Sequence, residues 1–251
     1  MKLPKIDLPI YDFELPSTGR KIKFRPFLVK EQKILLMALE EQKSEQAESN
    51  DQTIIDAVKQ IIKNCIVETN FNVNEMSSFD IEYFFLHLRA RSISEKVNMS
   101  FRCKNTVEDK ECNNLMQFEH DILNSTIIEK NSNHNKTIFF TKDVGVVMKY
   151  PSFNAVEVLI NKNKKNSVEA ALDMIINSID YFFDKDGVYP IKELDKKDIL
   201  EYIENIPKSS FDKMDNFFNT MPVVKSNIEH KCSKCGFQHV IPLEGLTSFF
   251  A

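Results

Sequence analysis

The stretch 229-EHKCSKCGFQH-239 holds two cysteines separated by two residues, with a glycine directly after the second. Such a CxxC-Gly turn is typical of the cysteine knuckles that hold zinc, because the residue after the second cysteine takes a positive φ. The same cysteine spacing also occurs in thiol redox proteins. The position of the remaining cysteines decides which chemistry applies.

The chain has 5 cysteines in 251 residues. Cys65 falls on the apolar stripe of a predicted helix, so it is expected to be a small buried side chain. The other four form two pairs, each between two predicted strands: Cys103 with Cys112, and Cys232 with Cys235. Two hairpins with two thiols at each tip are typical of zinc ribbons. We therefore expect a structural zinc site of four thiolates that ties the middle of the chain to its end.

The first pair departs from the usual knuckle spacing. It reads C-x8-C, whereas zinc knuckles ordinarily place two to four residues between the cysteines. The intervening 106-TVEDKE-111 is polar and is expected to bulge from the knuckle as a loop. Three alternatives stay open: His230 or His239 replaces one cysteine, the CxxC is a redox couple, or the thiols are free. A redox CxxC opens a helix, but a β-like segment follows this one.

Composition indicates an ordinary soluble globular protein, with 42% hydrophobic and 28% charged residues. The formal net charge of -4 argues against a general nucleic-acid binder, and the lysines of 161-NKNKKN-166 are expected to mark a solvated loop. No apolar run is long enough to span a membrane. No GxGxxG, GxSxG or HExxH motif is present, so an enzyme is not expected.

The hydrophobic pattern predicts an α+β fold, with short antiparallel β-hairpins, packed helices and a zinc-ribbon-like module made by two distant segments. We expect a single integrated body over residues 1–251. Its expected parts are an N-terminal β-hairpin in 1–29, a helical segment in 30–92, the zinc-ribbon-like module in 93–123 plus 223–243, and a hairpin and helices in 124–222.

The helices predicted in the second half of the chain include three that lie close to apolar or aromatic stretches. They cover 152-SFNAVEVLINK-162, 167-SVEAALDMIINSIDYFF-183 and the closing 244-EGLTSFFA-251. The last carries the aromatic pair Phe249 and Phe250, which either contacts a partner protein or folds back onto the chain.

Three stretches of the sequence resemble the T4-like phage baseplate protein family, the hub assembly proteins of contractile-tailed phages. They are LPSTGRKIKFRPFLVKEQKILLMALE near the start, SSFDIEYFFLHLRARSISEKVNMSFRCKN in the middle, and EHKCSKCGFQHVIPLEGLTSFF at the end. The likeness spans nearly the whole chain, whereas residues 124–220 match only in general character.

The resemblance implies a structural or assembly role in the tail baseplate hub, without catalysis. The expected partners are other baseplate hub or tail proteins, with no nucleic acid and no membrane. The expected location is the cytoplasm of the infected bacterial host during assembly, or the baseplate of the virion tail. The alternatives are a zinc-ribbon adaptor that binds nucleic acid and a CxxC redox protein.

Overall fold

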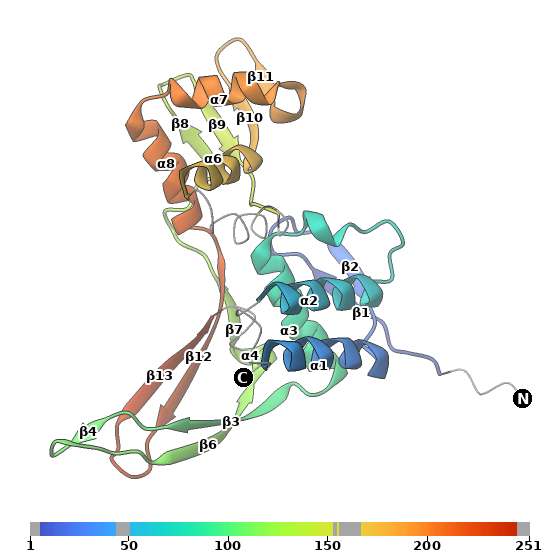
Figure 1. Ribbon diagram of the computed structural model, residues 1–251, viewed down its shortest axis with the longest axis vertical. Helices are drawn as coiled ribbons and strands as arrows, with labels where there is room; N and C mark the ends of the chain where they lie inside the picture. Colours follow the sequence, from blue (N-terminus) through green and yellow to red (C-terminus); the bar gives the residue numbers. More distant parts are fainter. Residues whose placement is uncertain (1–5, 44–50, 153–154, 156–166, 245–251) are drawn as a thin grey trace, which may run out of the picture. The chain divides into compact units, whose positions relative to one another are not determined.

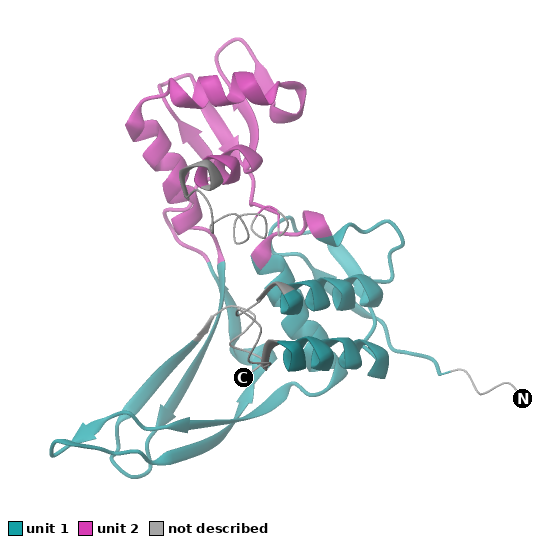
Figure 2. Cartoon of the chain, in the orientation of Figure 1, with its two compact units in different colours: residues 1–73, 79–129, 223–251 teal, residues 74–78, 130–222 magenta. Residues whose placement is uncertain are grey.

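The computed structural model describes residues 6–43, 51–152, 155 and 167–244. The chain forms two compact units (Figure 2): unit 1 holds residues 1–73, 79–129 and 223–251, and unit 2 holds residues 74–78 and 130–222. Both combine helices with small antiparallel sheets, which confirms the predicted α+β class. That the whole chain forms a single integrated body stays a prediction. Residues 156–162 and 245–251, including Phe249 and Phe250, lie outside the described residues.

Unit 1 begins with the predicted β-hairpin, followed by helices (Figure 1). The strands are antiparallel, with Tyr11 opposite Phe24. The elements are β1 (Tyr11–Glu14), β2 (Lys21–Phe24), α1 (Val29–Lys43), α2 (Asp51–Cys65), the 3-10 turn η1 (Val73–Glu75), whose last two residues belong to unit 2, and α3 (Ser78–Ser92).

Aromatic packing holds the hairpin against α3. The Phe84 ring meets those of Phe13 and Phe24 edge to face, with centroid separations of 5.0 and 5.1 Å. Such pairs contribute about 0.5–1.5 kcal/mol each beyond their buried area. Cys65 is fully buried at the end of α2, as expected for a core residue.

Two buried acids fix the turns around this hairpin. The Asp80 carboxylate of α3 accepts hydrogen bonds from the backbone N–H of Ser17, at 2.9 Å, and from the Ser17 hydroxyl. Glu31 in the first turn of α1 is fully buried and pairs with Arg25 at 3.1 Å. It also accepts the Leu28 N–H at 2.8 Å, which satisfies an N–H at the start of the helix. The motifs LPSTGR and FRPFLVKE are thus built around specific ion and hydrogen-bond pairs.

Two β-ribbons form most of the rest of unit 1. In the first, β3 (Lys96–Arg102) pairs with β6 (Leu115–Asp121). In the second, β12 (Val223–Lys231) pairs with β13 (Gln238–Glu244) on one side and β7 (Thr126–Glu129) on the other. A single helical turn, α4 (Ile122–Ser125), connects β6 to β7.

The two ribbons face each other along their length. Phe118 of β6 stacks on His230 of β12 at 4.7 Å, and Phe101 of β3 meets His239 of β13 at 5.3 Å. Further along, His120 Nε2 lies 2.8 Å from the Ser226 hydroxyl. Because side chains alternate along a strand, these contacts come from the inward face of each ribbon, and the cysteines continue the same faces.

Unit 2 is built on a four-stranded antiparallel sheet of order β11-β10-β9-β8. The strands are β8 (Thr137–Phe139), β9 (Gly145–Met148), β10 (Ile179–Phe183) and β11 (Val188–Pro190). The helices are α6 (Ser167–Asn177), α7 (Lys196–Glu204) and α8 (Lys208–Asn219), and η2 (Ile191–Glu193) is a short 3-10 turn. Met148, Ile175, Ile179, Met214 and Phe217 are among the buried residues of its core.

One predicted helix of unit 2 is shorter than expected. The sequence predicted a helix over 167–183, but α6 ends at Asn177 and Ile179–Phe183 form β10. The strand pairs with β9 and β11, and Ile179 and Phe182 are buried. Long-range pairing therefore overrides the local helical pattern. Across the described residues, no helix is long and apolar enough to cross a membrane.

Candidate metal centre

The four paired cysteines meet at one end of the two ribbons. Their sulfur atoms all lie within 4.8 Å of one another. Cys103 lies 3.6 Å from Cys235 and Cys112 lies 3.9 Å from Cys232, sulfur to sulfur. A zinc ion with four thiolates at ~2.3 Å requires sulfur separations of about 3.8 Å. The sequence-predicted pairs are therefore brought together at distances that suit a tetrahedral ion.

Cys232 and Cys235 form a compact turn. The Gly236 N–H donates to the Cys232 carbonyl at 2.9 Å, and the Cys232 N–H donates to the Phe237 carbonyl at 2.9 Å. Gly236 has a φ of 73°, a conformation that glycine adopts without steric cost. This explains why glycine follows the second cysteine.

The other pair repeats this geometry despite its longer spacing. The Asn113 N–H donates to the Cys103 carbonyl at 3.0 Å, and the Cys103 N–H donates to the Asn114 carbonyl at 2.9 Å. Asn113 has a φ of 51° and occupies the position that Gly236 has in the first turn. Asparagine tolerates this left-handed conformation better than other side chains. Both cysteine pairs thus form the same knuckle.

The additional residues of C-x8-C form a small hairpin. β4 (Thr106–Val107) and β5 (Lys110–Glu111) pair antiparallel, and Glu108 and Asp109 between them both have positive φ, as a two-residue hairpin loop favours. The Cys112 N–H closes its base on the Asn105 carbonyl at 2.8 Å. The predicted loop is therefore a six-residue insertion into an otherwise ordinary C-x2-C knuckle.

Hydrogen-bond donors surround the sulfur atoms. The side-chain amides of Asn105 and Asn114 approach Cys235 and Cys232 at 3.7 and 3.6 Å. Backbone N–H groups of Cys235 and Lys234 lower the pKa of Cys232, and that of Phe237 lowers the pKa of Cys235. Burial, by contrast, raises the pKa of Cys103. The hydrogen bonds thus favour the thiolate forms of Cys232 and Cys235. A cation between the sulfurs would offset the negative charge of the thiolates.

His239 is the site residue that sequence reasoning undervalued, since it was considered only as a replacement for one of the cysteines. Lone histidines on hairpins are usually exposed, but His239 is buried, and its Nε2 lies 3.1 Å from the Cys103 sulfur. It lies outside the cluster of four mutually close ligands. Its place suits an N–H donor to the Cys103 thiolate, as in the outer shell of many metal sites. His230 instead stacks on Phe118 and is not among the four mutually close ligands.

The fold and site define an α+β protein in which two distant segments meet at a buried four-cysteine cluster that is suited to a metal ion. A family model described as T4 bacteriophage base plate protein matches residues 8–251, and the chain belongs to this family. The chain is similar to baseplate hub assembly protein gp26 of Enterobacteria phage T4, with 23% identity over 243 residues. The match covers 96% of this chain and 97% of that relative. No solved structure matches this chain.

Proposed function

We propose that this protein is a structural or assembly protein of a phage tail baseplate hub, acting through protein–protein contacts without catalysis. The observation that carries the proposal is the length of the similarity, which covers 96% of this chain and 97% of a baseplate hub assembly protein. A likeness of this extent is not confined to one motif. The proposed partners are other hub or tail proteins.

The polar clusters in the described residues suit this role. His120 lies between the Ser125 and Ser226 hydroxyls, each 2.8 Å from Nε2, where it links β6 to β12. The buried acids Asp80 and Glu31 fix turns. Each of these groups is explained by holding the fold together.

The test is isolation of the tagged, full-length protein from infected cells, followed by mass spectrometry. We expect baseplate hub or tail proteins to be enriched over a tagged protein of similar size and charge. Enrichment of ribosomal or polymerase subunits instead would favour the nucleic-acid adaptor and contradict the proposal.

The proposed cofactor is one structural zinc ion held by Cys103, Cys112, Cys232 and Cys235. Four thiolates close a tetrahedral site and leave no position for substrate, so such a zinc contributes folding energy rather than chemistry. The CxxC turn leads into β13 instead of opening a helix, which further separates it from redox CxxC sites.

Metal analysis with a paired variant tests the zinc. We expect about one zinc per chain, and replacing Cys232 and Cys235 by serine should abolish it and lower the melting temperature by about 10 °C or more. Ser233→Ala in the same turn keeps all four thiols and serves as the control. A serine variant that melts like the wild type, or a metal-free wild type with a readily titrated CxxC thiol, would contradict the assignment.

A further inference from the structure

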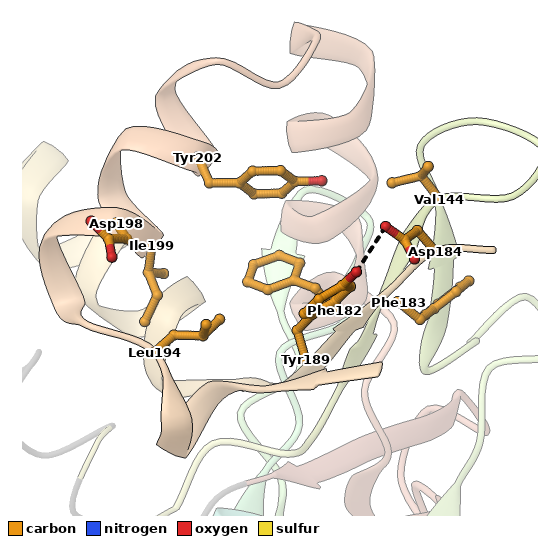
Figure 3. A pocket seen from close by; sticks show the side chains of 9 residues that line it. All are labelled: Val144, Phe182, Phe183, Asp184, Tyr189, Leu194, Asp198, Ile199 and Tyr202. Atoms are coloured by element: carbon orange, nitrogen blue, oxygen red, sulfur yellow. Dashed lines mark hydrogen bonds between the residues drawn. The ribbon is translucent and has the colours of Figure 1, made fainter. Parts of the chain in front are cut away.

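Unit 2 contains a pocket whose lining includes none of the four clustered cysteines. It measures about 300 Å³ and lies between the β10–β11 hairpin and α7 (Figure 3). Its lining is aromatic and aliphatic apart from two carboxylates: Val144, Phe182, Phe183, Asp184, Tyr189, Leu194, Asp198, Ile199 and Tyr202. All of these residues belong to unit 2.

The pocket has a fixed floor and an apolar rim open to solvent. Phe182 is buried and meets the Tyr202 ring edge to face at 5.0 Å. Tyr189, Leu194 and Tyr202 line the pocket and yet are 42%, 36% and 41% exposed. Large side chains that line a pocket and remain exposed are typical of protein contact sites.

One wall is held rigidly by Asp184. Its carboxylate accepts the backbone N–H groups of Asp186 and Gly187 at 2.8 and 3.0 Å, and the Tyr189 hydroxyl at 3.1 Å. These bonds fix the β10–β11 turn and the direction of the Tyr189 ring. The pocket is therefore preformed, which reduces the entropy cost of binding.

The charge around the pocket favours a basic occupant. Residues 179–206, which form most of the pocket, contain eight acidic residues and four lysines, whereas the remainder of the chain has as many basic as acidic residues. The formal net charge of -4 thus falls on this segment. In Figure 3, Asp184 and Asp198 lie at opposite ends of the lining, with Phe182 and Tyr202 between them. Asp198 forms no hydrogen bond or ion pair with the described part of the chain.

We propose that this pocket binds a basic segment of a partner protein that inserts an arginine next to a large apolar side chain. The arginine stem covers the apolar lining, and its guanidinium lies against the tyrosine rings with a carboxylate in reach. The inference deepens the proposed function and rests on it for the partner's identity, namely another baseplate protein. The chemistry of binding follows from the pocket itself.

The test uses the full-length protein and a short labelled peptide with a central Arg-Phe-Arg, compared with the same peptide carrying Glu-Phe-Glu. We expect saturable binding of the arginine peptide, followed by fluorescence anisotropy, and at least about tenfold weaker binding of the glutamate peptide. Raising the salt concentration should weaken the arginine complex.

Two variants locate the binding, and a third provides the control. Asp198→Lys and Tyr202→Ala should each weaken it about fivefold or more. Asp215→Lys makes the same charge change on an exposed residue of α8 outside the pocket and should leave binding within about twofold. Because Asp198 is exposed, its substitution tests the site without disturbing the core.

Several results would overturn the inference. They are equal binding of both peptides, an equal loss in the Asp215→Lys control, or self-association of the wild type that Tyr202→Ala abolishes. The last would make the occupant a second copy of this chain. If hub proteins co-isolate with the Asp198→Lys variant as with the wild type, the pocket inference fails and the proposed function stands. If the peptide binds but no baseplate protein co-isolates, the proposed function fails.

Discussion

At the scale of single residues, the Arg25–Glu31 pair shows how an ion pair fixes the path of the chain. Burial alone would raise the pKa of Glu31, but hydrogen bonds from Arg25 and the Leu28 N–H hold it below its usual value. Arg25 also donates to the Asn64 carbonyl at 2.9 Å, so it links the β2–α1 connection to the end of α2. Loss of Arg25 would leave the buried Glu31 carboxylate with only Lys30, an exposed side chain whose Nζ lies 3.5 Å away.

Arg25→Met removes the principal partner of the buried Glu31 carboxylate and leaves only the exposed Lys30 ammonium, 3.5 Å away. We expect the free energy of unfolding to fall by about 3 kcal/mol, whereas Arg25→Met with Glu31→Leu should lose much less. Urea denaturation measures both. Lys23→Met, which removes an exposed ion pair with Asp12, is the control and should cost less than about 1 kcal/mol. A double variant as unstable as Arg25→Met would contradict this account.

Glu82 on α3 predicts a pH dependence of stability. Its side chain is half-buried and has no hydrogen bond or ion pair among the described residues, and burial raises its pKa from 4.5 to about 7. The folded state therefore holds this proton more tightly than the unfolded chain. Ionising Glu82 destabilises the folded state. The contribution of Glu82 to the free energy of unfolding therefore falls as the pH rises from 4.5 to about 7.

Glu82→Gln removes that penalty. At about pH 8 we expect the variant to be more stable than the wild type by about 1–3 kcal/mol, and at about pH 4 the two should be equal. Urea denaturation at both pH values gives the difference, and Glu40→Gln, at an exposed position of α1, is the matched control. A gain of the same size at both pH values would show that charge is not its cause.

His239→Phe tests whether this histidine supports the metal without binding it. The substitution keeps a ring against Phe101 and removes the N–H that faces the Cys103 sulfur. We expect zinc affinity to fall about tenfold at an unchanged stoichiometry of about one. Competition with a chelator measures the affinity. Loss of all bound zinc would instead make His239 a ligand.

At the scale of elements, the sequence was most informative where structure depends on neighbours in the chain. The hydrophobic pattern predicted the hairpin in 1–29 and the helical segment in 30–92, where β1, β2 and α1 to α3 lie, and the spacing of the thiols predicted the two cysteine pairs. β10 was missed because its strand character comes from pairing with β9 and β11. The apolar pocket was missed because β10, β11 and α7 form it together. His239 was undervalued because burial of a lone histidine depends on the facing ribbon.

The hairpin formed by β4 and β5 should be dispensable. Deleting residues 106–111 converts C-x8-C into C-x2-C and leaves both knuckle hydrogen bonds of Cys103 in place. We expect zinc content to be unchanged, with stability within about 1 kcal/mol of the wild type because loop closure becomes slightly cheaper. Deleting Ser233 and Lys234, which separate the other two ligands, is the contrasting change and should abolish zinc binding. Loss of metal from the first variant would show that the hairpin shapes the knuckle.

At the scale of the whole molecule, most of unit 2, residues 130–222, is an insertion between two paired strands of unit 1. The chain leaves unit 1 after Glu129 and returns at Val223, and these two residues are opposite each other in the β7–β12 pair. Unit 1 is thus assembled from three separate stretches of sequence. The four-cysteine cluster joins two of them, since residues 103 and 112 belong to one stretch and residues 232 and 235 to another.

The expected single integrated body can be tested by calorimetry. We expect one unfolding transition, with equal calorimetric and van't Hoff enthalpies, in the zinc-loaded full-length protein. The variant with serine at positions 232 and 235 should shift that transition as a whole. Two transitions, only one of which moves in the variant, would show instead that the units unfold separately.

The two matching knuckles also bear on how such centres are recognised in other genomes. A search that fixes the interval between cysteines discards any chain in which one turn has gained residues, although the backbone around the sulfurs is the same. In this chain the residue that follows the second thiol, glycine in one turn and asparagine in the other, has a positive φ in both turns, whereas the count of residues between the thiols differs. Comparisons that score this position would align ligand pairs of unequal length.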